Sequence, residues 1–136
     1  MKKIIILWGF LFTVQMAFAQ DTSRSAKAIY YGKRARQQFM SENFDSALIL
    51  NRMAINMDST LSWIQFNIAL TYIMEGKGDP VENYTKALII NEHTANSKQA
   101  LSNAMNDLDD AQRRYGPLVE YDLVKQVLID RYNRYP

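Results

Sequence analysis

Few side chains in this sequence could carry out chemistry or hold a metal ion. His93 is the single histidine and there is no cysteine, so the spaced ligands that a zinc site requires are missing. The densest acidic group is Asp107, Asp109 and Asp110, which lacks the glycine and the later glutamate of a calcium loop. Arginines follow three and four residues onward, so ion pairing along one helix explains this acidic group. We therefore expect no bound metal and no cofactor.

Motifs of the common enzyme classes are also missing. The chain contains no G-x-S-x-G nucleophile elbow, no P-loop and no dinucleotide-binding fingerprint. Without cysteine there is no cysteine nucleophile, and a lone histidine in a polar segment is most simply a solvated loop residue. We predict that the protein is not an enzyme, and an enzyme or metal-binding protein remains the remote alternative.

The distribution of charge argues against some partners. The formal net charge is +2, from 16 basic and 14 acidic side chains. Lys2 and Lys3 account for that surplus, because without them 14 basic side chains balance the 14 acidic ones. Proteins that bind nucleic acid or anionic membranes rely on a basic surplus. We expect neither as a partner.

The N-terminus has the pattern of a secretory signal. A pair of lysines precedes an apolar run from Ile4, and small residues at Ala17 and Ala19 suit the cleavage site. The competing interpretation is an uncleaved anchor, but the apolar run is shorter than the ~20 residues that span a bilayer. We predict that residues 1–19 are a cleaved signal peptide of a bacterial protein that is periplasmic or secreted, with no stable membrane insertion afterwards.

The remaining chain divides into a short disordered linker, 20–24, and one helical domain, 25–136. Apolar residues recur at steps of three and four throughout that domain, which predicts helices. No Asn-Gly or Asp-Gly hairpin signal interrupts an alternating pattern, so we expect no strands. The predicted fold is all-α, with about six helices. Their approximate ranges are Ser25–Met40, Asn43–Met57, Leu61–Glu75, Pro80–Ile90, Ser97–Tyr115 and Leu118–Tyr135.

Glycine, proline and capping residues mark the predicted ends of these helices. Asp79 is placed to cap a helix that has Pro80 at its first position, where a missing N–H costs nothing. Gly116 and Pro117 are predicted to form a second boundary of this kind, with the glycine just past one helix and the proline at the first position of the next. Gly32 is the exception, because it lies inside a helical pattern at a cost of about 1 kcal/mol relative to alanine.

The stretch Leu61–Glu75 is apolar around most of its circumference. A surface helix needs a single apolar stripe, whereas this one carries two, which predicts a central helix covered on more than one side. The two stripes are Trp63, Phe66, Leu70 and Ile73, and Ile64, Ile68 and Tyr72.

An internal repeat supports this organisation. Ala54 aligns with Ala87 at a period of 33 residues, and Asn51, on the inward face of its helix, aligns with Tyr84. An earlier helix precedes each unit, and the second unit carries aromatic and small residues at Phe66–Ala69, Tyr72 and Gly76.

This pattern resembles tetratricopeptide repeats. The resemblance implies right-handed stacked helical hairpins in an α-solenoid, with repeats at about 28–60 and 61–93 and a capping hairpin at 97–135. Stacked neighbours bury a core that one hairpin cannot bury alone. The residues expected to pack between repeats are Ala35, Ala47, Ala54, Ala69, Tyr72, Tyr84 and Ala87.

The resemblance also implies a function in protein–protein interaction. The inner, concave surface of such domains holds peptides, and aromatic residues and arginine are favoured in binding hot spots. The candidate contact residues are Arg36, Phe39, Trp63, Phe66, Leu70 and Ile73. The leading hypothesis is an adaptor that binds a protein or peptide, or itself, through this face.

Two alternatives stay open. The same stripe could be ordinary core if the C-terminal hairpin closes over it, because aromatic stripes at helical spacing usually pack inside. The protein could also be structural and self-associating, with Tyr121, Tyr132 and Tyr135 of the last helix covering a second copy.

Overall fold

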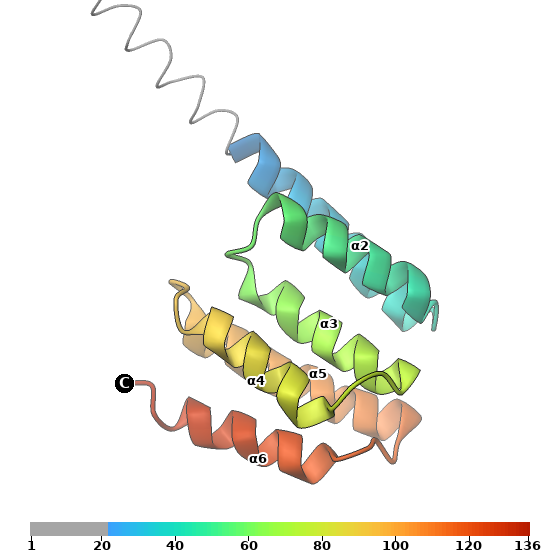
Figure 1. Cartoon of the computed structure of the whole chain (residues 1–136), viewed down its shortest axis with the longest axis vertical. Coiled ribbons are helices and arrows are strands. Elements are labelled where there is room, and N and C mark those ends of the chain that lie inside the picture. Colours follow the sequence, from blue (N-terminus) through green and yellow to red (C-terminus); the bar gives the residue numbers. More distant parts are fainter. Residues whose placement is uncertain (1–21) are drawn as a thin grey trace, which may run out of the picture.

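A computed structural model describes residues 22–136 of the chain, and this part is all-helical without strands (Figure 1). The predicted all-α class with six helices is confirmed. The predicted signal peptide, 1–19, lies outside the described residues. The first helix covers residues 22–40. It is followed by α2 (Phe44–Met57), α3 (Ser62–Glu75), α4 (Pro80–Asn91), α5 (Ser97–Tyr115) and α6 (Tyr121–Tyr132).

Most helix ends lie at the predicted capping and turn residues. The Asp79 side chain accepts a hydrogen bond from the Glu82 N–H at 2.8 Å, and Pro80 opens α4 as predicted. Gly76 ends α3 with φ of 65°, the left-handed region that glycine adopts at little cost. Gly116 ends α5, where an added Cβ would lie 2.2 Å from the Gln112 carbonyl oxygen.

Three predicted boundaries are wrong, at the start of the first helix and at both ends of the last one. Residues 22–24 are helical, although the sequence predicted a linker there. The last helix begins at Tyr121 rather than Leu118 and ends at Tyr132 rather than Tyr135. Glu120 has φ of 55°, which interrupts the helical backbone just before Tyr121. Pro117 therefore does not open this helix.

Helix α3 lies at the centre of the fold, as its apolar circumference predicted. It contacts α2, α4 and α5, and its Trp63 and Ile64 side chains pack against the first helix at Gly32. Helix α6 does not contact α3 directly but packs against α4 and α5. Figure 1 shows α2, α3, α4 and α6 following one another down the molecule.

The apolar core has two parts. The larger lies among α3, α4, α5 and α6, and the smaller joins Ala28 of the first helix to Ala54 and Ile64. Six of the seven predicted repeat-packing residues are buried, namely Ala35, Ala47, Ala54, Ala69, Tyr84 and Ala87. Tyr72 is half-buried instead, and its hydroxyl accepts a hydrogen bond from Arg52 at 2.7 Å.

Within residues 22–136, none of the helices combines the length and the apolar character that crossing a membrane requires.

Candidate functional site

The six predicted contact residues have different environments. Phe66, Leu70 and Ile73 are only 3%, 5% and 8% exposed and belong to the larger core. Their main role in this structure is therefore packing, which is the alternative that the sequence left open. Only Leu70 among the three also reaches the wall of a pocket, described below.

Trp63 packs between two helices. An added Cβ at Gly32 would lie 2.4 Å from Trp63 Cη2, closer than real side chains approach. The glycine inside the first helix is therefore explained by a close approach of the indole ring. Trp63 is partly buried and packs against the smaller core, so it too contributes to the fold.

Arg36 and Phe39 of the first helix reach across to α5. The Arg36 guanidinium donates to both Asp107 carboxylate oxygens, at 2.6 and 3.1 Å, the bidentate geometry that arginine favours. The Phe39 ring lies edge-on to Tyr115, with centroids 6.3 Å apart. The Arg36–Asp107 contact joins residues 71 positions apart, and α5 also packs against α3.

A pocket of about 300 Å³ remains where these elements meet. Its walls come from the first helix, α2, α3 and α5, so no single sequence segment forms it. The lining residues are Ala35, Arg36, Phe39, Met40, Asn51, Asn67, Leu70, Thr71, Asp107, Asp110, Ala111, Arg114 and Tyr115.

Two asparagine side chains in the pocket wall have unsatisfied polar atoms. Asn51 is 2% exposed, and its Oδ1 has no hydrogen-bond partner among the described residues. Asn67 Nδ2 is likewise buried and unpaired in this part of the chain. An unmade hydrogen bond of this kind costs about 1–3 kcal/mol. One atom is an acceptor and the other is a donor, and both residues line the same pocket.

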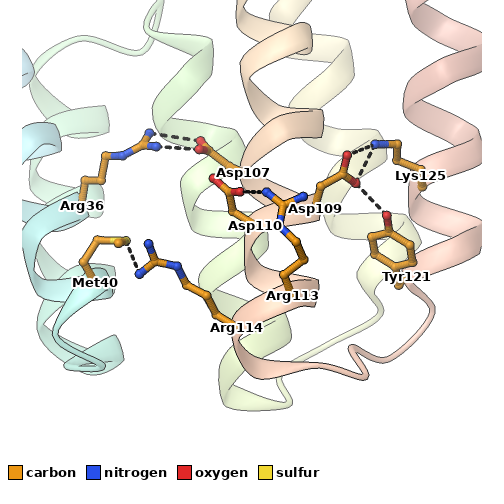
Figure 2. Close-up of polar contacts among 9 residues, drawn as sticks. All are labelled: Arg36, Met40, Asp107, Asp109, Asp110, Arg113, Arg114, Tyr121 and Lys125. Carbon is orange, nitrogen blue, oxygen red and sulfur yellow. Dashed lines mark hydrogen bonds and ion pairs between the residues drawn. The ribbon is translucent and has the colours of Figure 1, made fainter.

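The charged residues of the pocket balance. Arg36 and Arg114 contribute two positive charges, and Asp107 and Asp110 contribute two negative ones. Arg114 Nη1 lies 4.0 Å from Met40 Sδ. Figure 2 shows the two side chains pointing toward each other, and Arg114 makes no ion pair within residues 22–136. The four charges of the lining sum to zero, but Asp110 also pairs with Arg113, which does not line the pocket. Arg114 is therefore the lining charge without an ion-pair partner among residues 22–136.

The three aspartates of the acidic group on α5 have different partners. The predicted pairing along one helix holds for Asp110 alone, which pairs with Arg113 (Figure 2). Asp107 pairs with Arg36, while Asp109 accepts hydrogen bonds from Lys125 at 2.6 Å and Tyr121 at 2.7 Å.

Asp109 titrates below the ordinary range. Partial burial pushes its pKa upward, but the hydrogen bonds from Lys125 and Tyr121 outweigh burial and hold the pKa below its usual value. The same contact raises the pKa of the Tyr121 hydroxyl, because Asp109 stabilises the protonated phenol. Asp109 is thus fixed to α6, on the side of α5 away from the pocket.

A second group of polar residues lies where α3, α4 and α5 meet. The Ser62 hydroxyl donates to Asn91 Oδ1 at 2.7 Å, and Asn91 Nδ2 donates to the Ser97 carbonyl oxygen at 2.9 Å. Thr94 adds a hydrogen bond to the Asn91 carbonyl at 2.9 Å. Asn91 is fully buried, and both ends of its amide are paired. No pattern in the sequence indicates this junction.

His93 lies in the turn between α4 and α5 and is exposed, away from the pocket. Across residues 22–136, no three metal-ligating side chains of His, Cys, Asp or Glu gather in one place.

Several pocket residues were not among the predicted contacts. Asn51 did carry a signal, because it is a polar residue on the inward face of an otherwise apolar helix. Asp107, Arg114 and Tyr115 carried none, because their place opposite the first helix depends on how the hairpins stack.

None of the known family models matches this sequence, and a search of curated proteins finds no significant similarity to it. The tetratricopeptide resemblance therefore rests on the residues named above and stays a prediction.

Proposed function

We propose that this protein is an exported, tetratricopeptide-like adaptor that binds a protein partner at the pocket between the first helix and α5. The observation that carries this proposal is the pocket itself, which combines apolar walls with two buried amide atoms, Asn51 Oδ1 and Asn67 Nδ2, that have no partner among the described residues. Binding sites commonly pair apolar linings with a few polar groups.

The size of the pocket limits what the partner inserts. At about 300 Å³, it is at the lower end of ligand sites. Arg36, Phe39 and Tyr115 already bridge the face on which an extended peptide would lie. The proposed mechanism is therefore insertion of one partner side chain, with exposed residues around the opening completing the contact.

The organisation of the chain supports the adaptor class. The 33-residue repeat and the contacts of each helix with its sequence neighbours agree with stacked hairpins. Export is supported by the lysines, apolar run and small residues of the N-terminal segment.

Site-specific photo-crosslinking in producing cells tests the proposal. A crosslinking residue in place of Met40, which lines the pocket and is 45% exposed, should form an adduct with a discrete partner. The matched control replaces Ile89 of α4, which is 52% exposed and does not line this pocket. Adducts that form from position 89 and not from position 40 would contradict a partner site at the pocket.

Self-association is the second candidate function. The predicted tyrosines are engaged within the chain, since Tyr121 donates to Asp109 and the Tyr132 ring lies 5.1 Å from Lys98 Nζ. Val119 and Leu123 nearby are 64% and 58% exposed, and they would supply the contact instead. Light scattering of the purified protein over a range of concentrations tests this, with a constant monomer mass as the contradicting result.

A further inference from the structure

We infer that the pocket recognises a side-chain carboxamide, that of glutamine or asparagine, from the partner protein. This inference rests on the proposed function and adds the chemistry of the group that enters. Its starting point is the pair of unsatisfied atoms, Asn51 Oδ1 and Asn67 Nδ2, in one pocket wall.

A carboxamide matches this pair. Its NH₂ group can donate to Asn51 Oδ1 while its carbonyl oxygen accepts from Asn67 Nδ2. A carboxylate offers acceptors only, so it would leave Asn51 unpaired and lie near Asp107 and Asp110. An ammonium or guanidinium group offers donors only and would lie near Arg36 and Arg114. A neutral group that both donates and accepts is the one that pairs both unsatisfied atoms.

The lining also suits a side chain with an apolar stem. Phe39, Leu70 and Tyr115 contribute apolar surface, against which the methylene groups of glutamine can pack. A main-chain amide is flanked by polypeptide on both sides, and both flanking segments would have to enter a pocket that Arg36 and Asp107 already bridge. A side-chain terminus enters alone.

Access requires only a local movement. Both unpaired atoms are covered in the unbound arrangement. The terminal torsion of an asparagine side chain is broad, and rotation about it would turn each unpaired atom toward the pocket.

Nuclear magnetic resonance titration of the purified protein with small probes tests this inference. Propionamide represents the side-chain amide, N-methylacetamide the main-chain amide and propionate the carboxylate. Propionamide should produce saturable shifts of the Asn51 and Asn67 side-chain amide signals. Tighter binding of either other probe would overturn the inference, as would the absence of saturable shifts at these signals.

Variants of the two asparagines sharpen the test. Asn51→Leu and Asn67→Leu should each weaken propionamide binding about tenfold, the loss of one hydrogen bond. Asn56→Leu, an exposed position on the same helix as Asn51, should leave binding unchanged. Melting curves establish that each variant is folded. Unchanged affinity in a folded Asn51→Leu variant would contradict the inference.

Failure of this inference is distinguishable from failure of the adaptor proposal. Partner adducts at position 40 together with no propionamide binding would remove the carboxamide and keep the adaptor. Competition of propionamide, but not propionate, with adduct formation at position 40 would support both. Propionamide binding without any adduct at position 40 would establish the amide site and remove the partner site.

Discussion

Two buried asparagines in this molecule have opposite environments. Asn91, at the junction of α3, α4 and α5, has both ends of its amide hydrogen-bonded. Asn51, in the pocket wall, is buried almost as completely, yet its Oδ1 is unpaired within the described chain. Burial therefore does not distinguish a structural polar group from a binding group, whereas hydrogen bonding does.

Helix α5 shows the same difference between its two sides. Asp109 faces α6 and is held by Lys125 and Tyr121 in a partly buried cluster. Asp107, two residues earlier, faces the pocket and pairs with Arg36, whose side chain is 55% exposed. The α6 side of the molecule is thus tied together by satisfied polar contacts, and the pocket side retains contacts that can exchange.

The largest effect is expected at the junction. Replacing Asn91 with leucine would leave the Ser62 hydroxyl and the Ser97 carbonyl without a shared partner. We expect the free energy of unfolding to fall by about 3 kcal/mol. Urea denaturation measures this, and a loss of under about 0.5 kcal/mol, the range of a neutral surface change, would contradict the structural role of Asn91.

The second-largest loss of stability is expected at Asp109. Asp109→Asn removes a carboxylate that accepts from Lys125, so we expect a loss of about 1–2 kcal/mol at neutral pH. The folded-state pKa of Asp109 is lowered, so its stabilisation is fully present above the unfolded pKa of about 3.9. It is lost as pH falls through the folded pKa.

The difference between wild type and Asp109→Asn should therefore shrink below about pH 3.9. Thermal melts of both proteins across this range measure it. A difference that stays constant from neutral to strongly acidic pH would show that the charge of Asp109 is not what stabilises the contact.

Asn51→Leu is expected to act in the opposite direction to Asn91→Leu. Removing an amide whose buried Oδ1 has no partner among the described residues should raise the free energy of unfolding by about 1 kcal/mol. The two variants make the same chemical change at similarly buried sites, so each is the control for the other. A loss as large as that of Asn91→Leu would remove the distinction between the two asparagines.

The smallest effect is expected at Asp107. Its ion pair with Arg36 is exposed on the arginine side, and exposed pairs contribute little. Asp107→Asn should change the free energy of unfolding by less than about 0.5 kcal/mol. Urea denaturation of the Asp107→Asn and Asp109→Asn variants measures the difference between their losses in free energy of unfolding. Equal losses would mean that the two sides of α5 are equally fixed.

The sequence predicted the helices well where local chemistry decides them. The Asp79–Pro80 cap and the end of α5 at Gly116 were placed correctly, because capping depends on neighbouring residues. The start of α6 was missed, because the left-handed backbone at Glu120 is not required by the residue type.

The candidate site was predicted less well. The stripe of Phe66, Leu70 and Ile73 was identified from its spacing, but spacing alone does not tell a core face from a binding face. The Arg36–Asp107 contact spans 71 residues and leaves no local pattern. The sequence shows that Gly32 is an unusual residue for a helix interior. The tertiary structure gives the reason, because the Trp63 side chain packs against it.

By itself, the sequence determined that the chain is all-α, where most helices begin and end, and that α3 is central, because apolar periodicity and capping are local properties. Only the tertiary structure decided which polar residues meet. It paired Asn91 and left Asn51 Oδ1 and Asn67 Nδ2, which line a common pocket, without partners among residues 22–136. The physical reason is that hydrogen bonding between helices depends on how they stack, which no single segment encodes.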